Sequence, residues 1–130
     1  MFTANFISII AVSLLNIVIC WAWFSPWAFG RRWMELSGVS EMSMDLVGIG
    51  MGFLAFMARA YALAVVLNFA HVMTMYEGAL IGVFVALGFF VSALIGEMIH
   101  EKKPYRLMVI RGGYYVVSFM IAGAILGIWR

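Results

Sequence analysis

Charged residues are scarce in this chain of 130 residues. They make up 11% of it, while hydrophobic residues make up 66%. Soluble domains usually carry about a quarter charged residues. A water-soluble domain of this size could not bury so much apolar surface, so lipid is the expected solvent for most of the chain. The formal net charge is only +2, and the basic residues are scattered, which argues against a nucleic-acid partner.

Cysteine and histidine are also scarce. Cys20 is the only cysteine, so no disulfide can form within the chain. His71 and His100 fall on opposite sides of the expected membrane, which excludes a two-histidine metal or haem site within one subunit. No glycine-rich phosphate loop is present, and no serine or cysteine has a histidine at matching depth. We therefore expect no enzymatic chemistry, no metal and no cofactor.

The start of the chain lacks the features of a cleavable signal peptide. Residues 1–5 contain no basic residue, and the apolar run after them passes into WAWFSPW, which is not a small-residue cleavage site. We expect the first apolar segment to be retained as a membrane span.

Four long apolar runs are present, each of 19 to 24 residues, and they cover residues 6–24, 46–69, 78–99 and 107–129. About 20 residues are needed to cross ~30 Å of hydrocarbon as a helix. Backbone groups in lipid must be satisfied within the segment, so each run predicts a helix. Because the later links are short, neighbouring helices are expected to be antiparallel. We predict an all-α membrane protein: a single domain over residues 1–130, with four transmembrane helices in an up-down-up-down bundle.

Lysine and arginine are distributed unevenly around these spans. The links between spans 1 and 2 and between spans 3 and 4 share one side, whereas the other side has only Arg130. The positive-inside rule therefore places both links in the cytoplasm and both termini outside, in the cytoplasmic (inner) membrane. The basic residues on the cytoplasmic side are Arg31, Arg32, Lys102, Lys103, Arg106 and Arg111.

Tryptophans gather on the same side, where amphipathic rings prefer the interface between lipid and water. This predicted interfacial cluster consists of Trp21, Trp23, Trp27 and Trp33. The stretch RRWMEL within the first link is compatible with a short interfacial helical turn.

Arg59 lies near the middle of the second span. At about 100° per residue, the small residues Gly48, Gly52, Ala55 and Ala62 fall within about 60° of it, so this face is expected to pack against protein. Insertion of a central arginine costs ~2.5–3.5 kcal/mol, and about ten apolar neighbours at ~0.3–0.6 kcal/mol each offset that cost. The helix can therefore insert, but the charge still needs partners.

Matching depths give Arg59 two polar neighbours, Asn16 in the first span and Ser118 in the last, and no carboxylate. Two interpretations stay open for this midplane polar layer. In the first, Asn16, Ser118 and backbone carbonyls satisfy a structural arginine. In the second, a ligand brings the negative charge, and the layer is a site for an anion or a polar headgroup. The first is favoured, because the neighbours of Arg59 are merely polar.

Glu97 and Arg111 lie at similar depth on either side of the last link. We predict a structural ion pair between them, with proton coupling through Glu97 as the alternative.

Glycines four residues apart predict close contacts between helices. In the last span, the glycine face is opposite the face of Arg111 and Ser118, so one face can serve the bundle and the other a second subunit. We therefore expect a homo-oligomer or a subunit of a larger membrane complex. The methionines and phenylalanines are expected to face lipid. The glycine pairs are Gly48 and Gly52, Gly78 and Gly82, and Gly123 and Gly127.

The segment WAWFSPWAFGRRWMELSG resembles the signature of a bacterial membrane family, domain of unknown function 1761. The resemblance continues in YEGALIGVFVALGF, in EKKPYRLMVIRGGYYVVS and in GAILGIW, and covers essentially the whole chain. It implies an integral membrane protein of four helices with no established activity. It also implies an acidic or amide residue at the position of Arg111 and no fixed basic residue at that of Arg59, so a site on Arg59 would belong to a subset of the family.

Two functions remain to be weighed. The first is an oligomeric or accessory membrane subunit without catalytic chemistry, whose partners are the lipid bilayer and other membrane proteins. The alternative is a small transporter or channel-like protein with a midplane polar or anion site around Arg59.

Overall fold

The computed structural model describes residues 5–24, 30–37, 46–102 and 104–129. Within these ranges the regular structure is entirely helical. Four helical stretches are long and apolar enough to cross a membrane, which confirms the predicted all-α class with four spans. These stretches are Phe6–Trp23, Leu46–Phe69, Met75–Glu101 and Tyr105–Ile128. The up-down-up-down order of the bundle stays a prediction.

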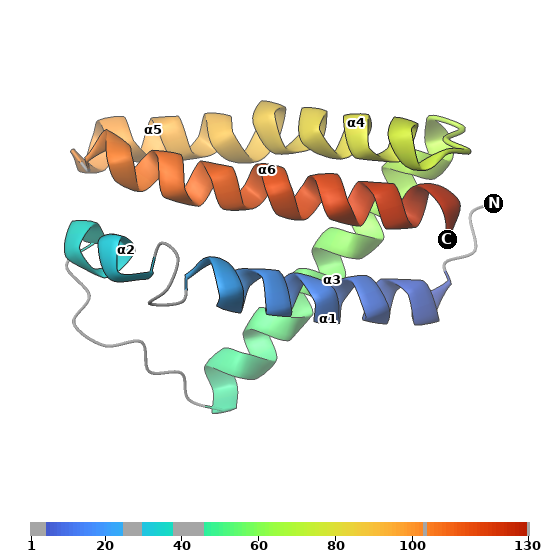
Figure 1. Ribbon diagram of the computed structural model, residues 1–130, viewed down its shortest axis with the longest axis horizontal. Coiled ribbons are helices and arrows are strands. Elements are labelled where there is room, and N and C mark those ends of the chain that lie inside the picture. The colour runs from blue at the N-terminus through green and yellow to red at the C-terminus, as the bar shows by residue number, and fades with distance from the viewer. Residues whose placement is uncertain (1–4, 25–29, 38–45, 103, 130) are drawn as a thin grey trace.

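The first span is α1 (Phe6–Trp23), which Asn5 caps by accepting bonds from the backbone N–H groups of Ile7 and Ser8. The short helix α2 (Gly30–Ser37) follows, in the stretch where the sequence suggests an interfacial turn. Figure 1 shows α2 beyond the C-terminal end of α1.

The second span is α3 (Leu46–Phe69), which crosses the other long helices on a diagonal (Figure 1). All of its buried residues lie in its second half, from Ala60 to Leu67. The first half diverges from the bundle and therefore has no buried residues, and this divergence creates the space described below. A left-handed backbone at His71, with φ of 56°, follows the end of α3.

The third span has three parts: α4 (Met75–Val85), the π-helix η1 (Ala86–Val91) and α5 (Ser92–Glu101). A π-helix hydrogen-bonds from residue i to residue i+5, so it is wider than an α-helix and is frequent at functional sites. The Ser92 hydroxyl donates to the carbonyls of Gly88, at 2.7 Å, and Phe89, at 3.2 Å. This side chain therefore bonds carbonyls inside η1.

The last span, α6 (Tyr105–Ile128), runs back along α5 and α4 (Figure 1). Glycines bring α4 and α6 into backbone contact. A Cβ on Gly78 would collide with the carbonyl of Gly123, and a Cβ on Gly123 with the carbonyl of Gly78. A Cβ on Gly82 or on Gly127 would also collide with a backbone carbonyl of the facing segment. We call this contact the glycine seam.

The glycine seam corrects one expectation about α6. The sequence suggests that one face of α6 serves the bundle and the other a second subunit. In the structure the glycine face packs on α4, while Tyr114 and Ser118 on the opposite side are also buried within the chain. Both faces of α6 are therefore used inside one molecule.

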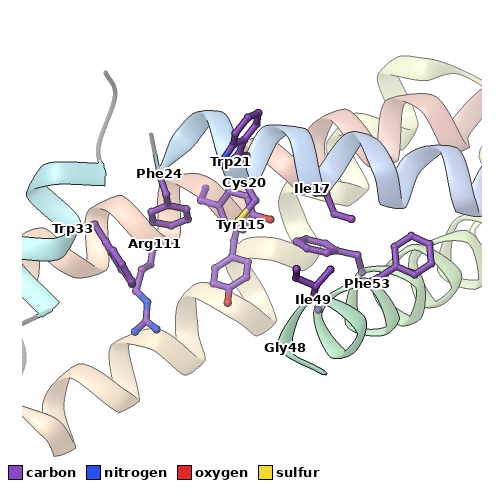
Figure 2. A pocket seen from close by; sticks show the side chains of 13 residues that line it. Ile17, Cys20, Trp21, Phe24, Trp33, Gly48, Ile49, Phe53, Arg111 and Tyr115 are labelled. Carbon is purple, nitrogen blue, oxygen red and sulfur yellow. The ribbon is translucent and has the colours of Figure 1, made fainter. Parts of the chain in front are cut away.

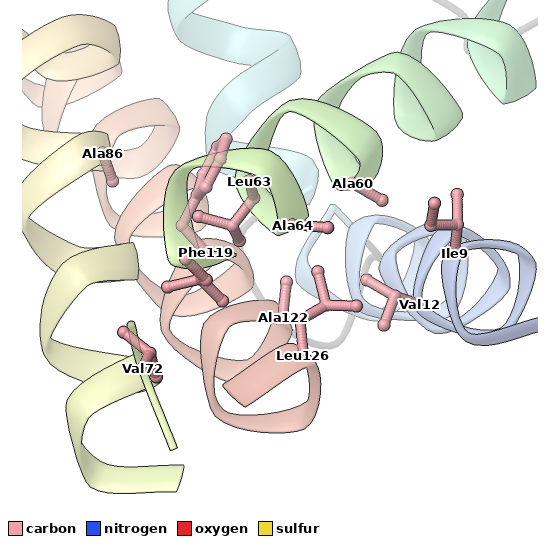
Figure 3. Packing of buried hydrophobic residues seen from close by; sticks show 11 residues of the cluster. Ile9, Val12, Ala60, Leu63, Ala64, Val72, Ala86, Phe119, Ala122 and Leu126 are labelled. Atoms are coloured by element: carbon pink, nitrogen blue, oxygen red, sulfur yellow. The ribbon is translucent and has the colours of Figure 1, made fainter. Parts of the chain in front are cut away.

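The apolar core joins α1, α6 and the second half of α3 (Figure 3). Its members include Val12 from α1, Leu63 from α3 and Leu126 from α6, each at most 2% exposed. This cluster closes the bundle at the level of the second half of α3. The first half of α3 lies beyond it.

Candidate functional site

A cavity of about 420 Å³ lies where α3 diverges, between α1, α2, α3 and α6 (Figure 2). Sites for small molecules usually measure ~300–1,000 Å³ and are mostly apolar. Most of the side chains lining this cavity are apolar or aromatic. Trp21 and Ile49 line it and are 79% and 53% exposed, so the cavity opens to the outer surface of the bundle between α1 and α3.

Next to the cavity, the Arg59 guanidinium is enclosed by aromatic rings. Its central carbon lies 5.0 Å from the centre of the Phe56 ring, 5.4 Å from that of Tyr115, 5.6 Å from that of Phe90 and 6.0 Å from that of Phe119. Each distance is within the ~6 Å over which a cation is attracted to a ring face. We call these four rings the Arg59 cage.

Three elements build the cage. Phe56 precedes Arg59 by one turn of α3, while Tyr115 and Phe119 are one turn apart on α6, where residues i and i+4 share a face. Phe90 comes from η1 and packs on both α6 rings, with centroid distances of 5.1 Å to Tyr115 and 4.7 Å to Phe119. The π-helical segment therefore supplies the ring that closes the cage.

The structure brings together two members of the predicted midplane layer. Asn16 and Arg59 line one small void between α1, α3 and α6. Ser118 is buried, but its hydroxyl donates to the Tyr115 carbonyl of its own helix at 3.2 Å. The described residues thus place Asn16, but not the Ser118 hydroxyl, at the guanidinium.

Three buried side-chain atoms in the described part of the chain have no hydrogen-bond partner: Asn16 Oδ1, Arg59 Nη1 and Tyr114 Oη. They come from α1, α3 and α6. The Cys20 thiol and the Arg59 guanidinium are the polar groups that interact electrostatically with the Tyr114 hydroxyl. Neither has the geometry of a hydrogen bond to it. We call Asn16, Cys20, Arg59 and Tyr114 the polar cluster.

A buried polar atom without a partner is uncommon and requires an explanation. Here Asn16 and Arg59 line one small void, and two members of the polar cluster, Cys20 and Tyr114, line the cavity. The polar cluster is therefore in contact with a space large enough for a ligand.

A continuous row of rings connects the cage to the opposite end of the cavity. Starting at α2, Trp33 packs on Phe24 at 5.5 Å, Phe24 on Tyr114 at 5.6 Å, and Tyr114 on Tyr115 at 5.5 Å between ring centroids. Tyr115 belongs to the cage. Aromatic surface therefore lines the cavity from α2 to Arg59.

For the predicted ion pair between Glu97 and Arg111, the described residues record no contact of their side chains. Glu97 is exposed on α5, whereas Arg111 is half-buried and lines the cavity. The ion pair stays a prediction, because similar depth alone does not require two side chains to lie on facing sides of their helices. Arg111 lies beside Trp33 at the end of the cavity towards α2 (Figure 2).

The tryptophans of the predicted interfacial cluster take different positions. Trp21 and Trp33 line the cavity, whereas Trp23 donates its indole N–H to the Ile110 carbonyl at 3.0 Å and so ties α1 to α6. Trp27 lies outside the described residues.

Sequence reasoning missed the Arg59 cage and Tyr114. Phenylalanines were expected to face lipid, yet Phe56, Phe90 and Phe119 surround the charge. A usable signal was present: Phe56 lies three residues before the arginine, and an aromatic pair at i and i+4 lies at similar depth in the last span.

Comparison with known proteins gives a family but no activity. Residues 7–127 match the model of the family described as "Protein of unknown function (DUF1761)". Neither a curated protein nor a solved structure matches the chain.

Proposed function

The chain belongs to the DUF1761 family of unknown function, and on that premise we propose that it binds a small amphipathic molecule within the membrane. The head of this molecule is negatively charged or accepts hydrogen bonds, and it meets the polar cluster. Its apolar part fills the cavity. Because the cavity opens on the outer surface of the bundle, such a molecule enters from the lipid. Binding of this kind suits a small carrier or sensor.

The unpartnered Arg59 Nη1 is the observation that carries the proposal. Aromatic faces attract the cation but leave its N–H edges without strong acceptors. Tyr114 adds a second free donor, and the Asn16 amide adds a further polar group. A ligand that accepts hydrogen bonds satisfies the Arg59 and Tyr114 donors together, whereas Asn16 Oδ1 is itself an acceptor and needs a donor.

A purely structural arginine accounts for only part of this arrangement. Cation–π contacts contribute ~0.5–2 kcal/mol each, so four of them offset the ~2.5–3.5 kcal/mol cost of a central arginine. They explain why the charge is tolerated. They do not explain why Tyr114 Oη has no partner at the cavity, or why Asn16 Oδ1 has none at the void that it shares with Arg59.

The test uses 12-bromododecanoate, because bromine quenches tryptophan fluorescence and Trp21 and Trp33 line the cavity. With protein purified in mild detergent, we expect saturable quenching that excess dodecanoate reverses. Arg59→Leu should weaken binding at least tenfold, since a hydrogen bond to a charged group contributes ~1.5–3 kcal/mol. The melting temperature should stay close to that of the wild type, because the loss of the cation–π contacts and the removal of the buried charge offset each other.

Arg31→Leu is the matched control, since Arg31 is exposed on α2; its affinity for the probe should equal that of the wild type. Equal affinity for Arg59→Leu and the wild type would exclude the proposed site. An absence of saturable quenching in the wild type would exclude it as well.

A second candidate function is that of an oligomeric or accessory subunit. The first half of α3 supports it, because a Cβ added at Gly50 or Gly52 would meet nothing within 4 Å. Small residues left open in this way allow another helix to approach closely. Light scattering in mild detergent tests the idea with Gly50→Leu: a wild-type oligomer that becomes a monomer supports it, and a wild-type monomer contradicts it.

The orientation in the cytoplasmic membrane is also part of the proposal, with both termini outside and the two basic links inside. In a Cys20→Ser background, a cysteine introduced at Glu101 should react with a membrane-impermeant maleimide only after the membrane is opened. Labelling of this cysteine in intact cells would show that the orientation is the opposite of the one proposed.

A further inference from the structure

Arg111 is a second cation at the cavity, and the proposed binding of a ligand head by the polar cluster does not involve it. It is half-buried and lines the cavity together with Trp33 and Phe24. Within the described part of the chain, the structure records neither an ion pair nor a hydrogen bond for its guanidinium. A half-buried arginine beside tryptophan, with no counter-charge among the described residues, is suited to bind an anionic group.

The two arginines lie towards different ends of the same space. Arg59 lies behind Phe56 and Tyr115, which line the cavity and also belong to the cage. Arg111 lies at the end towards α2 (Figure 2). Among the residues that the structure describes, no carboxylate lines the cavity between them, and the surface that connects them is the row of aromatic rings. The cavity therefore offers one positive charge near each end and apolar walls in between.

From this arrangement we infer that the ligand is a single-chain amphipathic carboxylate and that Arg111 is the residue that first binds its carboxylate. The inference rests on the proposed function and narrows it to one substrate class. The volume sets the size: about 420 Å³ lies in the lower part of the ~300–1,000 Å³ range of small-molecule sites. One medium-length chain fills such a space, and the second chain of a phospholipid would have to stay outside it.

The charges set the head of the ligand. Each arginine can be neutralised by one negative charge, and a guanidinium binds a carboxylate through two parallel N–H···O bonds. The carboxylate binds Arg111 at the interface while the chain enters between α1 and α3. Access to Arg59 Nη1 then requires the Phe56 and Tyr115 rings to turn aside. Arg111 therefore determines how fast the ligand associates, and Arg59 determines the affinity of the deeper bound state.

The experiment compares three brominated probes by tryptophan quenching in detergent: 12-bromododecanoate, neutral 12-bromododecanol and a brominated phosphatidylglycerol with two chains. We expect the wild type to bind the carboxylate at least tenfold more tightly than the alcohol and to show no saturable binding of the phospholipid. Comparable affinity for the alcohol, or saturable binding of the phospholipid, overturns the assignment of substrate class.

Variants test the role of Arg111. Arg111→Gln should weaken binding of 12-bromododecanoate at least fivefold and slow its association, while Arg111→Lys keeps part of the affinity. Arg106→Gln is the matched control, because Arg106 is exposed on the same helix and does not line the cavity; its affinity should not change. If Arg111→Gln binds like the wild type while Arg59→Leu does not, the inference fails and the proposed function stands. If Arg111→Gln fails to fold, Arg111→Lys and the ratio of carboxylate to alcohol affinity in the wild type decide.

Discussion

The two sides of α6 differ in how they pack. Towards α4, glycines let backbone approach backbone along the glycine seam, with no room for a Cβ. Towards α1 and α3, Tyr114, Tyr115 and Arg111 of the same helix line a cavity. The Tyr114 hydroxyl on this side is one of the buried atoms without a partner. One helix therefore combines a tightly packed face with a loosely packed one.

This difference shows how a small membrane protein can separate stability from binding. Lipid tails are as apolar as leucine, so helices associate through close packing and not through the hydrophobic effect. The glycine seam provides such packing. The opposite face has unfilled volume and unsatisfied polar atoms, which lower stability and make the face suitable for a ligand.

The largest effect is expected from breaking the glycine seam. Gly123→Leu would place side-chain atoms on the Gly78 carbonyl, and neither backbone can yield without separating α4 from α6. We expect a loss of about 3 kcal/mol or more in the free energy of unfolding, visible as a collapse of the melting temperature. Gly96→Leu is the control, since a Cβ at Gly96 meets nothing within 4 Å. A normal melting temperature for Gly123→Leu would show that the seam is not the stable side.

A smaller effect is expected in the Arg59 cage. Phe90→Leu removes one cation–π contact and the ring contacts with Tyr115 and Phe119. We expect a loss of about 1–2 kcal/mol in the free energy of unfolding. Phe89 is the neighbouring residue and is 71% exposed, so Phe89→Leu should unfold like the wild type. Equal effects of the two substitutions would mean that the cage does not stabilise the protein.

Removal of an unpartnered atom should act in the opposite direction. Tyr114→Phe deletes a buried hydroxyl without a partner, so the free energy of unfolding should rise by up to about 1 kcal/mol. Affinity for 12-bromododecanoate should fall several-fold, because the protein loses one hydrogen-bond donor to the carboxylate. A variant that is both less stable and equally able to bind would show that this hydroxyl is structural.

The smallest effect is expected where α1 meets α6. Trp23→Phe removes the bond from the indole N–H to the Ile110 carbonyl. Hydrogen bonds between membrane helices contribute about 0.6 kcal/mol on average, and we expect a loss of that size in chemical denaturation. Trp129→Phe near the end of α6 should show no change. A loss above about 2 kcal/mol would indicate that this bond fixes the position of α1.

The sequence was a good guide to the spans and a poor guide to their faces. Run length and the hydrogen-bonding demand of the backbone determine where a membrane helix lies, and α3 occupies the same residues 46–69 as the apolar run. The face that a membrane helix turns towards protein is harder to predict, because lipid-facing and protein-facing positions are both apolar. The phenylalanines of the cage therefore looked like those that contact lipid.

The candidate site was predictable only where polarity marked it. Asn16 and Arg59 stand out in apolar runs, and the structure places them at one void. Ser118 stood out equally, but its hydroxyl can bond a carbonyl of its own helix, and it does so. The diagonal course of α3, which creates the cavity, depends on the packing of four helices together and leaves no local pattern.

The π-helical segment has a consequence for insertions and deletions. A π-turn is in effect an α-helix with one residue added, and an α-helix turns by about 100° per residue. The wide turn absorbs the added residue, so deletion of one residue within η1 should restore an α-helix and leave Leu94 and Met98 on the face that buries them. A deletion in the α-helical part of the span should instead rotate α5 by about that angle relative to α4. The extra residue of η1 therefore affects the Arg59 cage, to which Phe90 belongs, more than it affects the packing of α5.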